Sequence, residues 1–181
     1  MDMTDGVATR NAEAAAGESD QDIVAAVHVR RGRELWTLGR RLGLSADEAD
    51  DAVQEALTRL LRELARGNRI NEPEAWTFRV VYRLAMDEHR VRRRLGGVAD
   101  RLRQRTPDTG PEVNLRMAVW DEVGHLPERQ RAVLYLRYRS DFSFDQIAAI
   151  LGIAAGTARY HASTGVARIR DSLAKADGED R

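Results

Sequence analysis

Apolar residues recur every three or four positions along most of the chain, the spacing that predicts amphipathic helices. The first apolar stripe starts near Asp20 and reaches Leu42. Gly32 lies within it and leaves open whether this segment is one helix or two. A second stripe covers residues 53–64 and follows Ser45 and Glu48, which have the spacing of a capping box. No segment of useful length alternates apolar and polar residues, so the expected fold class is all-α.

Helix-breaking residues divide the chain into two parts. Gly67 ends the second helix, and Pro73 suits the first position of a third helix that ends in an arginine-rich run. Residues 96–114 hold several Gly and Pro residues with little apolar period, as a flexible linker does. We expect two small helical domains joined by this linker. The predicted boundaries are a disordered acidic tail at 1–19, a first domain at 20–95, the linker at 96–114, a second domain at 115–175 and a tail at 176–181.

The second domain has the spacing of a helix-turn-helix. Pro127 opens one helix, Ser143 and Gln146 form a second capping box, and Gly152 ends a short helix before a longer one. The second helix of such a motif lies in the major groove of DNA. The candidate DNA-facing residues are Thr157, Arg159, Tyr160, His161, Ser163, Thr164 and Arg168. On spacing alone, a helical hairpin that only packs remains an alternative.

The formal net charge is zero, but the charges are unevenly placed. In the first thirty residues acidic side chains outnumber basic ones by six to two, whereas arginines far outnumber acidic residues between positions 76 and 105. Local basic density, rather than total charge, determines affinity for phosphates. The middle of the chain is therefore a candidate nucleic-acid surface.

Several classes of protein are disfavoured by what the sequence lacks. It contains no cysteine, and its four histidines are scattered without metal-ligand spacing. No glycine-rich phosphate loop follows a strand. We therefore expect no catalytic site, no metal and no cofactor. The N-terminus lacks a signal peptide and no segment is long and apolar enough for a membrane, so a cytoplasmic protein without membrane insertion is expected.

Two sets of motifs, in order along the chain, carry a family resemblance. The first is Ala-Asp-Asp-Ala-Val-Gln-Glu at 49–55, followed by Pro73, Trp76 and the arginine run. The second is Leu-Pro-x-x-x-Arg-x-Val-Leu at 126–134 and Phe-Ser-Phe-Asp-Gln-Ile-Ala-Ala-Ile-Leu-Gly-Ile at 142–153. With these motifs the chain resembles the extracytoplasmic-function (ECF) sigma factors, bacterial initiation factors that retain only regions 2 and 4 of sigma-70. The resemblance covers roughly residues 20–173.

The resemblance implies a role for each surface. The helix after Ser45 would dock on core RNA polymerase through Asp50, Asp51, Gln54, Glu55 and Leu57. The third helix would hold the melted −10 element of promoter DNA through Trp76, Arg79, Arg83, Arg90, Arg92, Arg93 and Arg94. The helix-turn-helix would read the −35 element. An anti-sigma factor is a further candidate partner, and the free protein is expected to be a monomer.

The recognition helix departs from the family pattern. Residues 159–165 carry fewer basic residues than is usual, and Gly165 costs a helix about 1 kcal/mol relative to alanine. Arg83 stands where the family often has Asn. Two alternatives therefore stay open: an operator-binding helix-turn-helix regulator that acts without polymerase, and a degenerate sigma-like protein that binds polymerase but no longer recognises promoters.

Overall fold

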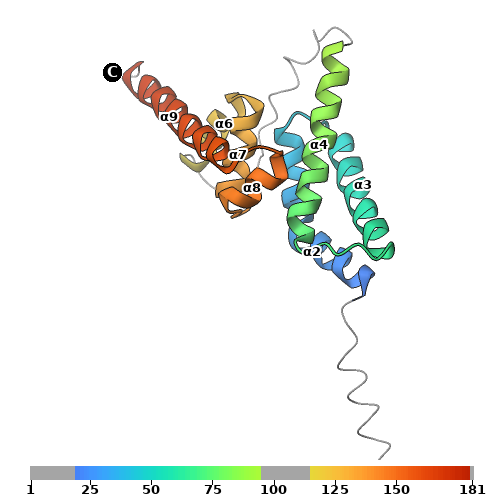
Figure 1. Cartoon of the computed structure of the whole chain (residues 1–181). Helices are drawn as coiled ribbons and strands as arrows, with labels where there is room; N and C mark the ends of the chain where they lie inside the picture. The colour runs from blue at the N-terminus through green and yellow to red at the C-terminus, as the bar shows by residue number, and fades with distance from the viewer. Residues whose placement is uncertain (1–18, 95–114, 180–181) are drawn as a thin grey trace, which may run out of the picture.

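The computed structural model describes residues 19–94 and 115–179, and these residues form seven helices (Figure 1). The helices are α2 (Asp20–Arg41), α3 (Ala46–Ala65), α4 (Pro73–Arg94), α6 (Leu115–His125), α7 (Glu128–Tyr138), α8 (Phe144–Leu151) and α9 (Ala155–Glu179). Within these ranges there is no strand, so the all-α prediction is confirmed. The predicted linker and residues 1–18 of the predicted N-terminal tail lie outside the described residues, whereas α9 continues to Glu179, into the predicted C-terminal tail.

Both predicted capping boxes are present. The amide of Ser45 donates to Glu48 Oε2 at 2.6 Å, and the amide of Glu48 donates to the Ser45 hydroxyl at 3.2 Å. Ser143 and Gln146 make the same pair of bonds at the start of α8. A third box, between Ser19 and Asp22, starts α2 and was not predicted, because aspartate replaces the usual Glu or Gln at its fourth position.

Two glycines inside helices have packing reasons. Gly32 does not divide α2, which is continuous. A Cβ atom at Gly32 would lie 2.7 Å from the imidazole Cδ2 of His28, so the glycine leaves room for that ring. At Gly165 a Cβ would lie 3.0 Å from Leu134 Cδ1, and its absence lets α9 approach α7 closely.

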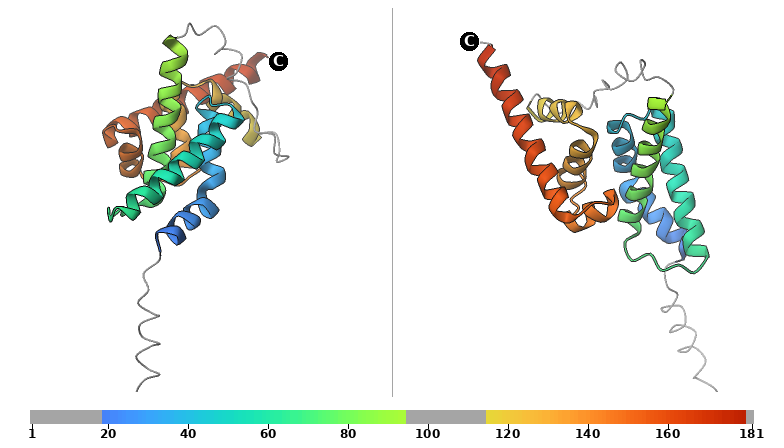
Figure 2. Two further views of the ribbon diagram at one scale, coloured as in Figure 1. Left: turned by 90° about the vertical axis from the view of Figure 1, so that its right-hand side faces the viewer. Right: turned by 45° about the horizontal axis from the view of Figure 1, so that its top comes forward.

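The helices form two groups (Figure 2). Helices α2, α3 and α4 pack on one another around fully buried residues that include Leu35, Leu60 and Phe78. Helices α6 to α9 form the second group, with Val133, Leu136 and Ile147 fully buried. The first group contains the helices of the predicted domain at 20–95, and the second group contains those of the predicted domain at 115–175.

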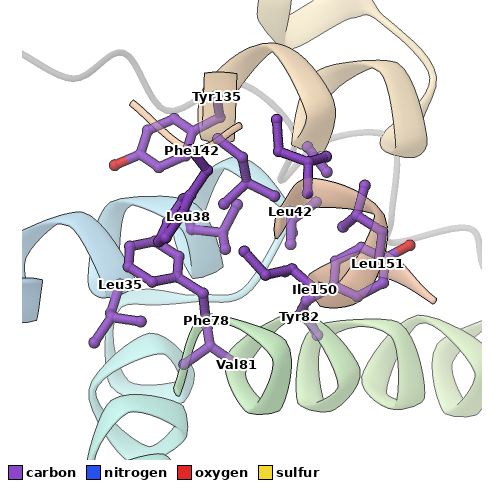
Figure 3. Packing of buried hydrophobic residues seen from close by; sticks show 14 of the residues in the cluster. Leu35, Leu38, Leu42, Phe78, Val81, Tyr82, Tyr135, Phe142, Ile150 and Leu151 are labelled. Carbon is purple, nitrogen blue, oxygen red and sulfur yellow. The ribbon is translucent and has the colours of Figure 1, made fainter. Parts of the chain in front are cut away.

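A buried seam joins the two groups. We define the seam as the contact of α2 and α4 with α7 and α8. Its residues are Leu38, Leu42, Phe78, Tyr82, Tyr135, Phe142, Ile150 and Leu151, which Figure 3 labels, together with Arg131. All nine are buried. The sequence predicted two separate small cores, because apolar periodicity shows that a helix has a buried face but not which helix covers it. In the structure the two cores are continuous.

Candidate nucleic-acid and polymerase interface

Helix α4 presents several arginines, in different environments. Arg83, Arg90 and Arg94 are exposed, and Arg90 forms an ion pair with Asp87 at 2.6 Å. Arg79 is partly buried, and its Nε is buried without a hydrogen-bond partner among the described residues. A buried donor without a partner costs free energy, which makes Arg79 a candidate for binding a ligand. The side chain of Arg93 lies outside the described part of the chain.

Arg92 is engaged within the protein. Its guanidinium donates to Glu48 Oε2 at 2.5 Å and to the Gly43 carbonyl at 2.7 Å, and its Nε lies 3.2 Å from Glu88 Oε1. The side chain is 15% exposed. Partial burial would raise the pKa of Glu48, but the hydrogen bonds from Arg92 and Ser45 outweigh it and lower that pKa to about 2. Arg92 therefore ties the end of α4 to the start of α3.

A hollow of about 730 Å³ lies beside Trp76. The loop between α3 and α4 forms one wall with Asn68 and Asn71, and Arg79 also lines it. Gly67, at φ 79°, turns the chain into this loop. Trp76 is half-buried, so it is both packed and accessible from the hollow. Sequence reasoning missed the asparagines, whose only signal is a polar loop directly before the tryptophan-bearing helix.

The recognition helix is the N-terminal half of α9. Arg159, Tyr160 and Ser163 are exposed, with Tyr160 at 65%. The Arg159 guanidinium lies 5.6 Å from the centroid of the Phe144 ring, which orients it by a cation–π contact.

The remaining predicted residues of this helix are less accessible. Thr157, His161 and Thr164 are half-buried, and the Nδ1 of His161 is buried without a partner among the described residues. Arg168 is exposed, and its guanidinium donates to Gln130 Oε1 at 3.3 Å. Exposed arginine and tyrosine next to hydroxyl-bearing residues are a set that can contact base edges and phosphates.

The predicted polymerase-docking residues divide into surface and core. Asp50, Asp51 and Gln54 are exposed on one face of α3, and Glu55 forms an ion pair with Arg59 at 2.7 Å. Leu57 is only 6% exposed, because it belongs to the apolar stripe of α3 that packs into the core. Leu57 therefore supports this face from beneath.

Neither a metal-ligand cluster nor a membrane-spanning helix is found among the residues that the structure describes. The site is thus built from charged, polar and aromatic side chains on three helices and one loop.

Family models match both helix groups. The model for sigma-70 region 2 matches residues 28–95, and the model for sigma-70 region 4 matches residues 116–169. A basic helical region followed by a region 4 helix-turn-helix defines a transcription initiation factor of the sigma-70 class.

The ECF RNA polymerase sigma factor SigL of Mycobacterium tuberculosis is 32% identical over 164 residues, which are 87% of this chain and 93% of SigL. The ECF RNA polymerase sigma factor EcfG of Rhodopseudomonas palustris is 33% identical, over 75% of this chain and 74% of EcfG. The chain belongs to the ECF sigma factors.

Two solved structures share the fold. One is the sigma factor RpoE in complex with the anti-sigma factor NepR from Bartonella quintana. It has a TM-score of 0.64 and 22% identity, over 83% of this chain and 91% of that chain. The other is CnrH in complex with the cytosolic domain of CnrY, with a TM-score of 0.61 and 24% identity over 92% and 95% of the two chains.

Proposed function

We propose that this ECF sigma factor binds core RNA polymerase and directs it to promoters, holding the melted −10 element with α4 and reading the −35 element with α9. The observation that carries the proposal is the combination, in one chain of the family, of a partly accessible Trp76 and Arg79 at a hollow with an exposed recognition helix. The chain itself supplies positioning and strand separation, and polymerase supplies the chemistry. It acts in the cytoplasm as a monomer when free.

The hollow beside Trp76 suits an unpaired base. Binding of single strands requires cations for the backbone and aromatic or apolar surfaces for the bases. Arg83, Arg90 and Arg94 lie exposed on the same helix as Trp76. The unpartnered Nε of Arg79 at the hollow can donate to a base or a phosphate. We assign the −10 element to this surface.

The recognition helix suits duplex DNA, although few of its residues are basic. Arginine can bind guanine through two hydrogen bonds, and Arg159 is exposed and oriented by Phe144. Tyr160 and Ser163 are accessible beside it. The small number of cations on this helix favours the second candidate, a degenerate sigma-like protein that binds polymerase without reading a −35 element. An operator-binding regulator leaves the surface of α4 without a role.

The exposed acidic face of α3 is the proposed docking site on core polymerase. Asp50 and Asp51 are exposed, and neither carboxylate pairs with another side chain within residues 19–94 and 115–179. We also propose an anti-sigma factor as a partner, because one fold neighbour, the sigma factor RpoE, was solved in complex with the anti-sigma factor NepR.

Charge reversal tests the docking site. In the double variant Asp50→Arg and Asp51→Arg, we expect affinity for core polymerase to fall at least tenfold. The two arginines would replace the negative charges that are proposed to attract the docking partner. The control is Asp171→Arg, an exposed reversal on α9. Circular dichroism of the free variants checks folding. Core affinity equal to that of the control would contradict the assignment of this face.

A further inference from the structure

A second hollow, of about 630 Å³, lies where α4 meets the start of α7 and the end of α8, and we call it the α4–α7 hollow. Its floor is apolar. Half-buried Met86 of α4 lines it together with the buried Ile150 and Leu151 of α8, which Figure 3 shows next to Tyr82. Sites for small molecules have this size and an apolar lining with a few polar groups, so the floor suits a flat ring.

Three exposed arginines from both helix groups surround this floor. Arg83 and Arg90 come from α4, and Arg129 comes from the first turn of α7. Arg129 hydrogen-bonds the hydroxyl of Tyr82, which holds its guanidinium at the wall of the hollow. Guanidinium groups bind phosphate oxygens through paired, charge-assisted hydrogen bonds. The wall of the hollow therefore suits a phosphorylated ligand.

Two carboxylates line the α4–α7 hollow as well. Asp87 pairs with Arg90 at 2.6 Å, but their side chains are 63% and 71% exposed, so water screens the pair and Arg90 can turn toward a phosphate. Glu128 Oε1 lies 3.5 Å from Nδ1 of His89. Three arginines thus face two carboxylates, and the lining keeps an excess of positive charge.

One buried histidine in the lining lacks a hydrogen-bond partner for one of its ring nitrogens. His89 is only 5% exposed, and its Nε2 bonds to the Leu42 carbonyl. Because a carbonyl can only accept, Nε2 carries the proton, and in the neutral imidazole Nδ1 is an acceptor. Among the described residues this buried Nδ1 has no hydrogen-bond partner. A ligand hydroxyl, such as that of a sugar, can supply the missing donor.

Two helix ends give the α4–α7 hollow a direction. Helix α7 begins there at Glu128, and no side chain caps its first amides, which carry a partial positive charge. Helix starts of this kind bind anions. Helix α8 ends there at Leu151, where the last carbonyls carry a partial negative charge and can accept hydrogen bonds from ring amino groups. Phosphates therefore suit the α7 side of the hollow, and an aromatic base suits the α8 side.

We propose that the α4–α7 hollow binds a free nucleoside polyphosphate. Arg83, Arg90 and Arg129 hold its phosphates near the start of α7. His89 accepts a hydrogen bond from its sugar, and its base packs on the apolar floor. The site is additional to the proposed −10 surface, although the two share Arg83 and Arg90. A single DNA strand carries the same chemical groups, so the experiment compares both sources.

Isothermal titration calorimetry of the full chain compares ATP, GTP, inorganic pyrophosphate, adenosine and a pentanucleotide of single-stranded DNA. We expect ATP or GTP to bind at least tenfold more tightly than pyrophosphate or adenosine, because only a nucleotide uses both sides of the hollow. The proposal is overturned if neither nucleotide binds, or if pyrophosphate binds as tightly. A pentanucleotide that binds at this hollow more tightly than either nucleotide would also overturn it, since the hollow would then belong to the path of a DNA strand.

Arg129→Ala removes a cation of the hollow that lies outside the proposed DNA and polymerase surfaces. We expect this variant to bind the nucleotide at least tenfold more weakly. Arg170→Ala is the matched control, because it removes an exposed arginine of α9 outside the hollow. Urea unfolding of both variants checks that they are folded. Equal weakening in the two variants would show general attraction between charges and contradict a built site.

Methionine signals locate the bound nucleotide. The chain has four methionines, at positions 1, 3, 86 and 117, and only Met86 lines the hollow. In a chain labelled with methyl-¹³C methionine, the variant Met86→Leu identifies the signal of this residue. We expect ATP or GTP to shift the Met86 signal with the concentration dependence found by calorimetry. Nucleotide binding that leaves this signal in place would overturn the proposal. None of these measurements involves polymerase or a promoter, so their outcome is independent of the proposed function.

Discussion

The carboxylate of Glu48 shows how one residue connects two helix ends. It completes the capping box of α3 and accepts a hydrogen bond from Arg92 on α4. These bonds hold its pKa at about 2, below the usual 4.5. A carboxylate whose pKa is lower in the folded state stabilises the fold above its unfolded pKa, and the stabilisation disappears as the pH falls from about 4.5 to about 2.

The variant Glu48→Gln keeps a side chain that can complete the capping box but removes the charge. We expect it to lower the free energy of unfolding by about 1 kcal/mol at pH 7, since the Glu48 side chain is 35% exposed and the ion pair is partly screened. Urea unfolding at pH 7 and at pH 3 measures the difference from wild type, which should become smaller at pH 3. A difference that is the same at both pH values would argue against the ionic origin of this stability.

Arg92 and Arg94 make a matched pair on one helix, one engaged and one free to bind phosphate. Arg94→Ala should weaken promoter binding and reduce the slope of log affinity against log salt by about 1 per lost phosphate contact. Arg92→Ala should instead lower the urea midpoint and leave the salt slope unchanged, because its charge is paired with Glu48 and Glu88. Binding isotherms over a range of salt concentrations measure the slope for each variant. If Arg92→Ala flattens the slope as much as Arg94→Ala does, Arg92 contacts DNA after all.

On the recognition helix, Arg159→Ala should weaken binding of a −35 duplex by about 1–3 kcal/mol. Lys175→Ala is the control, because it removes the same charge about 24 Å farther along α9. Fluorescence anisotropy with labelled duplex measures both variants. Equal losses in the two variants would mean that Arg159 acts through general charge and not by reading a base.

At the scale of helices, α9 approaches α7 closely at Gly165. Replacing a helical glycine by alanine gains about 1 kcal/mol in helix propensity, but the new methyl group would press on the buried Leu134 and cost about 1–3 kcal/mol. We therefore expect Gly165→Ala to be neutral or destabilising. Gly124→Ala in α6, where a Cβ meets nothing within 4 Å, should stabilise the protein by up to 1 kcal/mol. Thermal unfolding compares them, and equal stabilisation would refute the close-packing explanation.

Individual helices could be predicted from the sequence because their signals are local. The capping boxes at Ser45 and Ser143 and the glycine at position 152, with φ 66°, mark helix ends by their own chemistry. Gly32 left the continuity of α2 open, because the His28 ring that a side chain at this position would meet is not part of any local sequence rule. By helix propensity alone, Gly165 lowers the stability of α9. Its benefit, the close approach of Leu134 on α7, is a tertiary contact that the sequence does not show.

At the scale of the whole molecule, the seam was the feature that could not be predicted. The aromatic pair of Phe78 and Phe142 and the bond from Arg131 to the α2 terminus join residues distant in sequence. Phe78 fits its own helix as ordinary core, Phe142 lies between α7 and α8, and Arg131 is charged, so the apolar pattern shows no surplus face. The candidate surfaces were identified better, because exposed charges on α3, α4 and α9 follow from helix periodicity and from the family motifs. Leu57 lies in the predicted apolar stripe of α3 and is buried, so its inclusion among the docking residues came from the family motif and not from helix periodicity.

In the proposed function, this chain converts core polymerase into a promoter-specific enzyme. The most direct measurement mixes purified protein with bacterial core RNA polymerase free of other sigma factors, and maps transcript starts on genomic DNA of the source organism. We expect binding to core together with discrete new start sites that share sequence near −10 and −35. Failure to bind core, with binding to duplex DNA intact, would instead favour an operator-binding regulator.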